Sequence, residues 1–122
     1  MTKRALIVDD SKLARMAAAK ALRAVRPDWE RVEATDADQA LEVVKTSRVD
    51  IALVDFNMPG RDGLQLAADL RASFPELPIA LISANAQIEI VSRAREIGAV
   101  FLPKPLTVDT LAVFLDALPG AS

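Results

Sequence analysis

The stretch Ala5-Leu6-Ile7-Val8-Asp9-Asp10 is an unbroken apolar run that ends in two carboxylates. Continuous rather than alternating apolar strands are typical of a parallel sheet that is covered on both faces. Ser11 follows at once and can cap a helix, which we expect to run to about Arg26 and to stop at Pro27. The start of the chain therefore predicts one strand–helix unit of a parallel α/β fold.

The same strand–helix unit recurs four more times along the chain. The expected strands are 31–35, 51–54, 79–82 and 99–102, and the expected helices are 37–47, 64–73, 86–97 and 108–118. Strict alternation of this kind predicts a single doubly wound (βα)5 domain of the α/β class, with helices on both faces of an open parallel sheet. The common strand order for five such strands is 2-1-3-4-5.

The length and the residues that are missing limit the possible functions. A chain of 122 residues is one domain's worth, and we expect that domain to span 1–122 with its core at about 4–118. The absence of cysteine excludes disulfides, iron–sulfur clusters and thiolate zinc sites, and it fits a cytoplasmic protein. The absence of histidine removes Ser-His-Asp triads, histidine bases and imidazole metal ligands.

The charge and the first residues bear on partners and location. A net charge of -2 and a pI near 5.1 argue against a direct nucleic-acid partner. The opening MTKRALIVDD has four apolar residues between two cations and an acidic pair, which is too short for a signal-peptide core or a membrane span. We therefore expect a soluble, cytoplasmic protein with no membrane partner.

Carboxylates follow two of the expected strands at the point where the sheet's winding reverses. Asp9 and Asp10 follow the first strand and Asp55 follows the third, and these strands are neighbours in the order 2-1-3-4-5. At about 5 Å, two such charges repel by roughly 3 kcal/mol at an effective dielectric near 20. A cation or a raised pKa must relieve this repulsion. Oxygen ligands favour Mg²⁺ or Mn²⁺, whose open positions suit phosphoryl chemistry. The alternative is that each residue only begins a loop or caps a helix.

Two further polar residues are expected at the same edge of the sheet. Ser83 ends the fourth strand with a hydroxyl, and Lys104 follows the fifth strand with a cation that can neutralise an anion. The alternatives are a helix cap for Ser83 and a solvated surface lysine for Lys104. Pro105 suits the first turn of a helix, and the Lys104-Pro105 bond can instead be cis; both options stay open.

Taken together, these residues resemble the receiver domain of two-component response regulators, of the CheY-like kind. The resemblance covers the whole chain and is carried by four motifs: Val8-Asp9-Asp10-Ser11, Asp55-Phe56-Asn57-Met58-Pro59-Gly60-Arg61-Asp62-Gly63, Ser83-Ala84 and Lys104-Pro105. The run D-x-x-M-P-x-x-D-G, preceded by an acidic pair and followed by K-P, is highly specific.

The resemblance implies a role for each matching residue. It makes Asp55 the phosphoacceptor, with Ser83 and Lys104 contacting the phosphoryl group. It places Mg²⁺ on Asp9, Asp10, Asp55 and the main-chain carbonyl of Asn57. Phe101 stands at the position of the switch aromatic, where many relatives have tyrosine, so an output that needs a tyrosine hydroxyl is in doubt. Asn57 and Asn85 flank the phosphoryl position and are expected to tune the lifetime of the phosphorylated state.

The expected function is that of a stand-alone receiver that is not an enzyme beyond its own phosphotransfer and autodephosphorylation. Its donor is a histidine kinase or a histidine phosphotransfer protein, because the chain has no histidine of its own. Its output passes to an unidentified protein target through the face of the fourth helix, fifth strand and fifth helix. The alternatives are a receiver cut from a longer regulator or hybrid kinase, a phosphorylation-independent adaptor, and an aspartyl-phosphate phosphohydrolase of the haloacid dehalogenase type. A phosphohydrolase of this type requires a second aspartate at the position that Asn57 occupies in this chain.

Two helices carry candidate contact residues. On the first helix, a stripe of cations at Lys12, Arg15, Arg23 and Arg26 also holds Met16 and Ala19. We predict that Arg15, Met16, Ala19 and Arg23 form a docking patch for the kinase, the alternative being a solvated face. On the fourth helix, Ile88 lies away from the core face and is a candidate for target contact.

Overall fold

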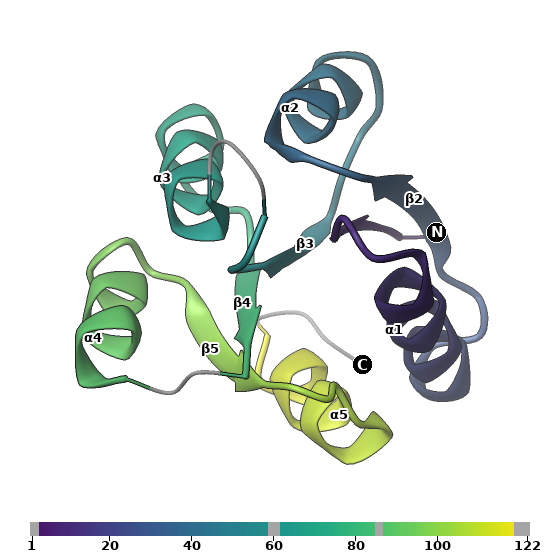
Figure 1. Cartoon of the computed structure of the whole chain (residues 1–122). Helices are drawn as coiled ribbons and strands as arrows, with labels where there is room; N and C mark the ends of the chain where they lie inside the picture. Colours follow the sequence, from purple (N-terminus) through teal and green to yellow (C-terminus); the bar gives the residue numbers. More distant parts are fainter. Residues whose placement is uncertain (1–2, 59–61, 85–86, 119–122) are drawn as a thin grey trace.

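The computed structural model describes residues 3–58, 62–84 and 87–118, in which five strands and five helices alternate (Figure 1). The strands are β1 (Arg4–Val8), β2 (Glu30–Ala34), β3 (Ile51–Asp55), β4 (Ile79–Ser83) and β5 (Val100–Pro103). The helices are α1 (Lys12–Val25), α2 (Ala37–Thr46), α3 (Gly63–Ser73), α4 (Ile88–Glu96) and α5 (Val108–Asp116). All neighbouring strands pair parallel in the order β2-β1-β3-β4-β5, which confirms the predicted fold and strand order.

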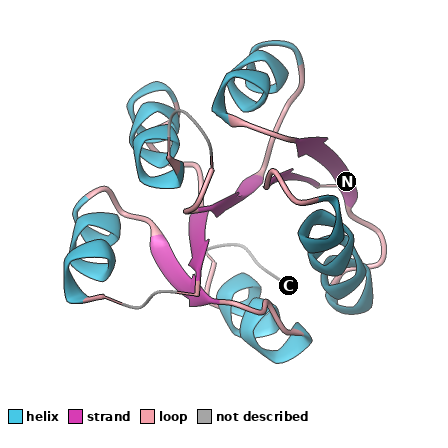
Figure 2. Ribbon diagram, in the orientation of Figure 1, coloured by secondary structure: helices cyan, strands magenta, loops and turns pink. Residues whose placement is uncertain are grey.

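The helices cover both faces of the sheet (Figure 2). α1 and α5 pack on one face, and α2, α3 and α4 pack on the other. Successive strand residues alternate between the two cores: Leu6 and Val8 face α2 and α3, whereas Ala5 and Ile7 face α1. Because both faces are buried, the central strands read as unbroken apolar runs rather than as alternating ones.

Side-chain caps begin four of the five helices. Ser11, Asp36, Asp62 and Thr107 each accept a hydrogen bond from a backbone N–H three residues later. Gln87, the residue before α4, makes no such bond. Gly98 follows α4 with a φ of 73°, the left-handed conformation that glycine adopts readily after a helix.

Element boundaries differ from the sequence predictions by one or two residues. β2 begins at Glu30 and α5 ends at Asp116. α4 spans Ile88–Glu96, and the predicted start of this helix at Ala86 lies outside the described residues. Within the described ranges, no helix is both long and apolar enough to cross a bilayer.

Candidate functional site

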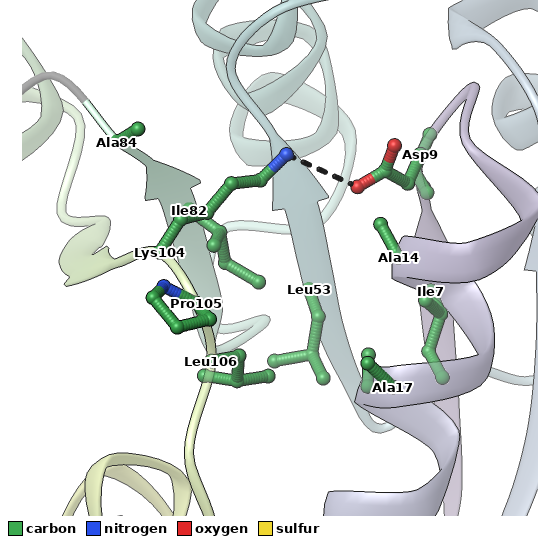
Figure 3. Close-up of a pocket in the computed structure, with 12 residues that line it drawn as sticks. Ile7, Asp9, Ala14, Ala17, Leu53, Ile82, Ala84, Lys104, Pro105 and Leu106 are labelled. Atoms are coloured by element: carbon green, nitrogen blue, oxygen red, sulfur yellow. Dashed lines mark ion pairs between the residues drawn. The ribbon is translucent and has the colours of Figure 1, made fainter.

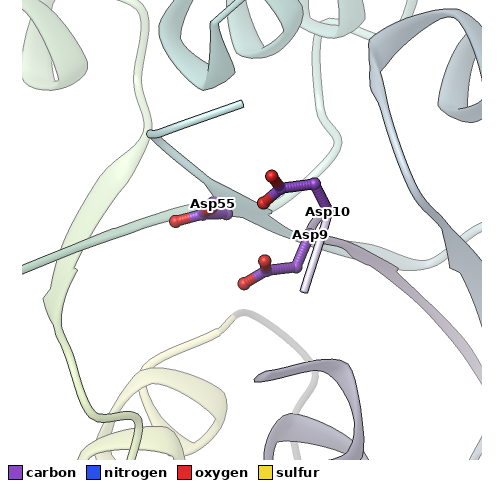
Figure 4. A group of neighbouring side chains, drawn as sticks. All are labelled: Asp9, Asp10 and Asp55. Carbon is purple, nitrogen blue, oxygen red and sulfur yellow. The ribbon is translucent and has the colours of Figure 1, made fainter. Parts of the chain in front are cut away.

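Three carboxylates converge at the carboxyl edge of the sheet, between β1 and β3. Asp55 is the last residue of β3, and Asp9 follows directly after Val8, which pairs with Val54. Asp9, Asp10 and Asp55 each offer one oxygen, and these oxygens lie within 4.8 Å of one another (Figure 4). The structure therefore brings together the three carboxylates that the strand order predicted to meet.

Asp9 is held through both its backbone and its side chain. Its amide donates to the Ala34 carbonyl at 3.1 Å, and its own carbonyl accepts from Arg15 Nη1 at 2.8 Å. Its Oδ1 accepts from the Ser11 amide at 2.9 Å, and its Oδ2 lies 3.5 Å from Lys104 Nζ. The carboxylate of this buried residue therefore has little freedom to turn.

Asp55 is the most deeply buried of the three, with 2% of its surface exposed. Its Oδ1 lies 2.8 Å from Lys104 Nζ, at ion-pair distance. Apart from this ion pair, no described residue hydrogen-bonds to that oxygen. Burial raises the pKa of Asp55, and the charge of Asp9 raises it further, against the lowering effects of Lys104 and of the Asn57 backbone. The carboxyl group is thus buried, and its one close polar contact among the described residues at Oδ1 is the Lys104 ammonium.

Lys104 extends from the loop between β5 and α5 toward Asp9 (Figure 3), and its Nζ also contacts Asp55. Its backbone amide donates to the Ser83 carbonyl at 3.0 Å, and its peptide bond to Pro105 is cis, which answers the question left open by the sequence. Burial lowers the pKa of Lys104, but its contacts with Asp55 and Asp9 outweigh this effect and leave the pKa above its ordinary value. Lys104 is therefore a cation placed between two of the three carboxylates.

Ser83 and Gly63 complete the surroundings of Asp55. Ser83 ends β4, the strand beside β3, and is fully buried. A Cβ atom added at Gly63 would clash with the Asp55 carbonyl oxygen, so α3 can begin this close to the end of β3 only with glycine at that position. From the sequence, Gly63 was predicted only as the last residue of the D-x-x-M-P-x-x-D-G run, and the signal for this close approach was a glycine directly after Asp62, which caps α3.

An apolar cavity of about 320 Å³ lies beside the carboxylates, between α1 and the β5–α5 loop (Figure 3). Small side chains of α1, Ala14, Ala17 and Ala18, form one wall, and Pro105 and Leu106 form part of the opposite wall. Asp9 and Lys104 supply its charged groups.

The donor set fits a hard divalent cation. The cluster offers carboxylate oxygens, and Asp55 contributes a buried oxygen that lacks a hydrogen-bond partner among the described residues. Mg²⁺ and Mn²⁺ prefer oxygen ligands of this kind, and binding would relieve the repulsion between the carboxylates. The arrangement can therefore hold such an ion while keeping a lysine next to any anion bound there.

The predicted patch on α1 requires correction. Ala19 is 6% exposed and packs in the core, so its placement on the outer stripe was wrong. The reason is that α1 lies against both the sheet and α5, which buries a wider arc of the helix than the sheet alone would. The Arg15 side chain is only 13% exposed and pairs with Glu33. Arg26 pairs with Asp116, whereas Met16 and Arg23 are exposed.

The remaining predicted residues differ in how far their side chains are buried. Asn57 has an exposed side chain just after β3, and Phe101 is half-buried on β5, packed against the core that α4 covers. Asn85 lies outside the described residues. Ile88 is strongly exposed at the start of α4, as expected.

The fold and the site together define the class: a doubly wound α/β domain with an acidic pocket at the switch point of its sheet. A family model described as the response regulator receiver domain matches residues 5–116. The chain belongs to this family, a component of two-component systems whose members are signalling modules rather than classical enzymes. Receiver domains bind Mg²⁺ at an acidic pocket and are phosphorylated by histidine kinases.

Curated relatives are longer than this chain. The transcriptional regulatory protein PdtaR of Mycobacterium tuberculosis is 37% identical over 111 residues, which are 89% of this chain and 53% of PdtaR. The sensor protein EvgS of Escherichia coli is 37% identical over 114 residues, 93% of this chain and 9% of EvgS. The chain thus spans about half the length of PdtaR and a small part of EvgS.

Solved structures share the whole fold. The chemotaxis protein CheY4 of Vibrio cholerae superposes with a TM-score of 0.88 at 25% identity, covering 98% of this chain and 100% of CheY4. The receiver domain of NtrX from Brucella abortus gives a TM-score of 0.82 at 30% identity and covers 93% of this chain and 99% of that domain. The CheY-like fold is therefore shown for nearly the whole of the chain.

Proposed function

We propose that this chain is a phosphoaccepting receiver that takes a phosphoryl group from a partner's phosphohistidine onto Asp55. The observation that carries the proposal is the Asp55 carboxylate itself: it is buried, lies 2.8 Å from Lys104 Nζ and shares a 4.8 Å cluster with Asp9 and Asp10. A buried carboxylate beside a fixed cation is suited to attack phosphorus, because the cation offsets the charge on the transferred group.

In the proposed transfer, an Asp55 oxygen forms a bond to phosphorus as the bond from phosphorus to the donor imidazole breaks. The imidazole leaves with its electron pair and takes a proton from solvent. Lys104 supplies a positive charge next to the phosphoryl oxygens, and the buried Ser83 hydroxyl provides a hydrogen-bonding group at the end of the adjacent strand. The product is an acyl phosphate that water later removes.

We propose that the acidic cluster holds Mg²⁺, or Mn²⁺, through Asp9, Asp10, Asp55 and the main-chain carbonyl of Asn57. When bound, such an ion neutralises charge on the phosphoryl oxygens. Asn57 and Asn85 are proposed to tune the lifetime of the acyl phosphate, since neither is a carboxylate that could orient an attacking water.

The proposed output is a change in the face formed by α4, β5 and α5. Ser83 is drawn toward the new phosphoryl group, and Phe101 rotates into the space that this vacates. Because Phe101 lacks a hydroxyl, its switch is steric. Ile88 and Val113 are strongly exposed on α4 and α5, and this face is the proposed contact for the protein target.

The proposed docking surface for the phosphohistidine partner lies on α1. Its residues are Met16 and Arg23, to which the structure adds the exposed Leu13. An apolar centre beside a basic side chain suits the amphipathic helix of a kinase or a phosphotransfer protein. Arg23→Glu is expected to slow transfer from such a partner and to spare phosphorylation by acetyl phosphate.

One candidate is a receiver that works on its own, and the match with CheY4, which covers the whole of that chain, is the likeness that favours it. The second candidate is a receiver that is part of a longer regulator or hybrid kinase, which the greater lengths of PdtaR and EvgS favour. Phosphotransfer at Asp55 is the same in both cases.

Incubation with acetyl phosphate and Mg²⁺, followed by intact-mass measurement, tests the proposed function. The expected result is a single phosphate adduct that is absent from Asp55→Asn and absent when EDTA replaces Mg²⁺. Lack of an adduct on the wild-type chain would favour the adaptor, and multiple turnover of phosphate esters would favour the phosphohydrolase.

A further inference from the structure

Arg15 joins three elements beside the acidic cluster rather than projecting from the surface of α1. Its Nη1 donates to the Asp9 carbonyl at 2.8 Å, and its Nε donates to Glu33 Oε1 at 2.9 Å. Glu33 pairs with Ile7 in the β1–β2 register, so its side chain points to the face of the sheet that α1 covers. One guanidinium thus connects α1, the end of β1 and the edge strand β2.

The carbonyl that Arg15 holds belongs to the peptide unit between Asp9 and Asp10. Because a peptide unit is planar, a hydrogen bond to its carbonyl oxygen restrains the orientation of the whole unit, including the amide nitrogen of Asp10. Asp10 is exposed, and none of the described residues forms a hydrogen bond with its carboxylate. Its position in the cluster therefore depends on the backbone that carries it, and that backbone is the part that Arg15 restrains.

We infer that Arg15 is a positioning residue for the divalent-cation site, and that Glu33 in turn orients Arg15. The inference rests on the proposed function in one respect, namely that the acidic cluster binds Mg²⁺. Outer partners that orient metal ligands commonly change metal affinity by about 10- to 100-fold when they are removed. A guanidinium suits this role because its Nε and Nη1 can donate in two directions at once, which the single ammonium of lysine does not reproduce.

The test is Mg²⁺ affinity measured by isothermal titration calorimetry on the full chain, with Arg15→Gln and Arg15→Lys. Both variants are expected to weaken Mg²⁺ binding by about tenfold. Lys20→Gln is the matched control, because it removes one positive charge from an exposed position on the same helix and is expected to leave the affinity unchanged. Glu33→Gln keeps Arg15 but removes its charged partner, and we expect it to weaken binding less than Arg15→Gln does.

Amide hydrogen exchange without Mg²⁺ provides a second readout. The Ser11 amide donates to Asp9 Oδ1, so loosening of the Asp9–Asp10 peptide should speed its exchange in both Arg15 variants while the β3 amides stay protected. Wild-type affinity in Arg15→Lys would overturn the inference, because charge alone would then suffice. Equal affinities in Arg15→Gln and Lys20→Gln would overturn it as well. Failure of the wild-type chain to bind Mg²⁺ would instead overturn the proposed function.

Discussion

The two sides of the site are built differently. On the β1 side, Asp9 is held by its amide, its carbonyl and both carboxylate oxygens, and the capping bond of Ser11 begins α1 directly beyond it. On the β4 side, the helix that follows is α4, and Gln87 provides no side-chain cap for its first turn.

Hydrogen bonds from α3 hold α4 at its C-terminal end instead. Arg71 of α3 donates to the carbonyls of Ile97 and Gly98 at 2.8 and 3.1 Å, and it also donates to the Pro75 carbonyl at 2.7 Å. This guanidinium satisfies carbonyls that follow both α3 and α4 at the edge of the sheet opposite the acidic cluster.

The comparison indicates that the residues on the β1 side are held more firmly than the first turn of α4. Ligands for a small cation need fixed positions, and the β1 side supplies them. α4 has no side-chain cap at the end nearer the site, whereas Arg71 anchors its far end, and this difference agrees with the output proposed for the face of α4, β5 and α5.

Lys104 connects both sides, since its side chain contacts Asp9 and Asp55 and its backbone amide donates to the Ser83 carbonyl at the end of β4. Lys104→Gln should therefore have the largest effect, slowing phosphorylation by acetyl phosphate about 100-fold or more, the usual range for losing one group that stabilises transition-state charge. Mg²⁺ affinity should not fall, because a competing cation is removed. Intact-mass time courses and calorimetry measure the two quantities, and a loss of Mg²⁺ binding would show that Lys104 supports the cluster rather than the transferred group.

Gly63→Ala should strain the junction of β3 with α3. The added methyl group would meet the Asp55 carbonyl and the Phe56 backbone, which cannot move aside as a flexible side chain could. We expect a loss of about 2 kcal/mol in the free energy of unfolding, measured by urea denaturation. Gly98→Ala is a control of a different kind, because its cost arises from a φ of 73° rather than from a close contact. An unchanged midpoint in Gly63→Ala would show that α3 shifts without cost.

Arg71→Gln should loosen the anchored end of α4. We expect a loss of about 1–2 kcal/mol in stability, since hydrogen bonds from a charged donor to carbonyls are removed. Exchange of the Gly98 and Ala99 amides should speed up while Mg²⁺ affinity stays unchanged. Arg93→Gln, at an exposed position on α4, is the matched control. A change in Mg²⁺ affinity in Arg71→Gln would contradict the separation of the two sides.

Asp55→Asn should stabilise the metal-free protein at neutral pH and raise its Tm. The pKa of Asp55 is raised in the folded state, so its ionised form favours unfolding. The stabilisation that a raised carboxyl pKa provides is complete below the ordinary value of 3.8 and is lost as the pH rises through the folded-state pKa. The advantage of the variant should therefore be present at pH 7 in EDTA and should shrink as the pH falls toward 4. A lower Tm for Asp55→Asn at pH 7 would show that its pair with Lys104 dominates.

The strand order and the meeting of the carboxylates were predictable because both follow from local patterns: apolar runs, turn residues and the acids that end the runs. The roles of Arg15 and Ala19 could not be predicted in this way. Arg15 finds its partners at Asp9 and at Glu33, and nothing on α1 itself signals a residue on β2. Ala19 is buried because α5 packs beside α1, an arrangement that the periodicity of α1 alone does not contain. The sequence signal for the burial of Ala19 was its small apolar side chain next to a stripe of cations.

Calorimetric titration of the wild-type chain with Mg²⁺ tests most directly whether crowded carboxylates between β1 and β3 form a cation site. We predict that one equivalent binds at neutral pH, and that Asp10→Asn and Asp55→Asn each weaken binding strongly while Asp38→Asn, an exposed acid on α2, does not. Wild-type binding no tighter than that of the Asp55→Asn chain would contradict the account.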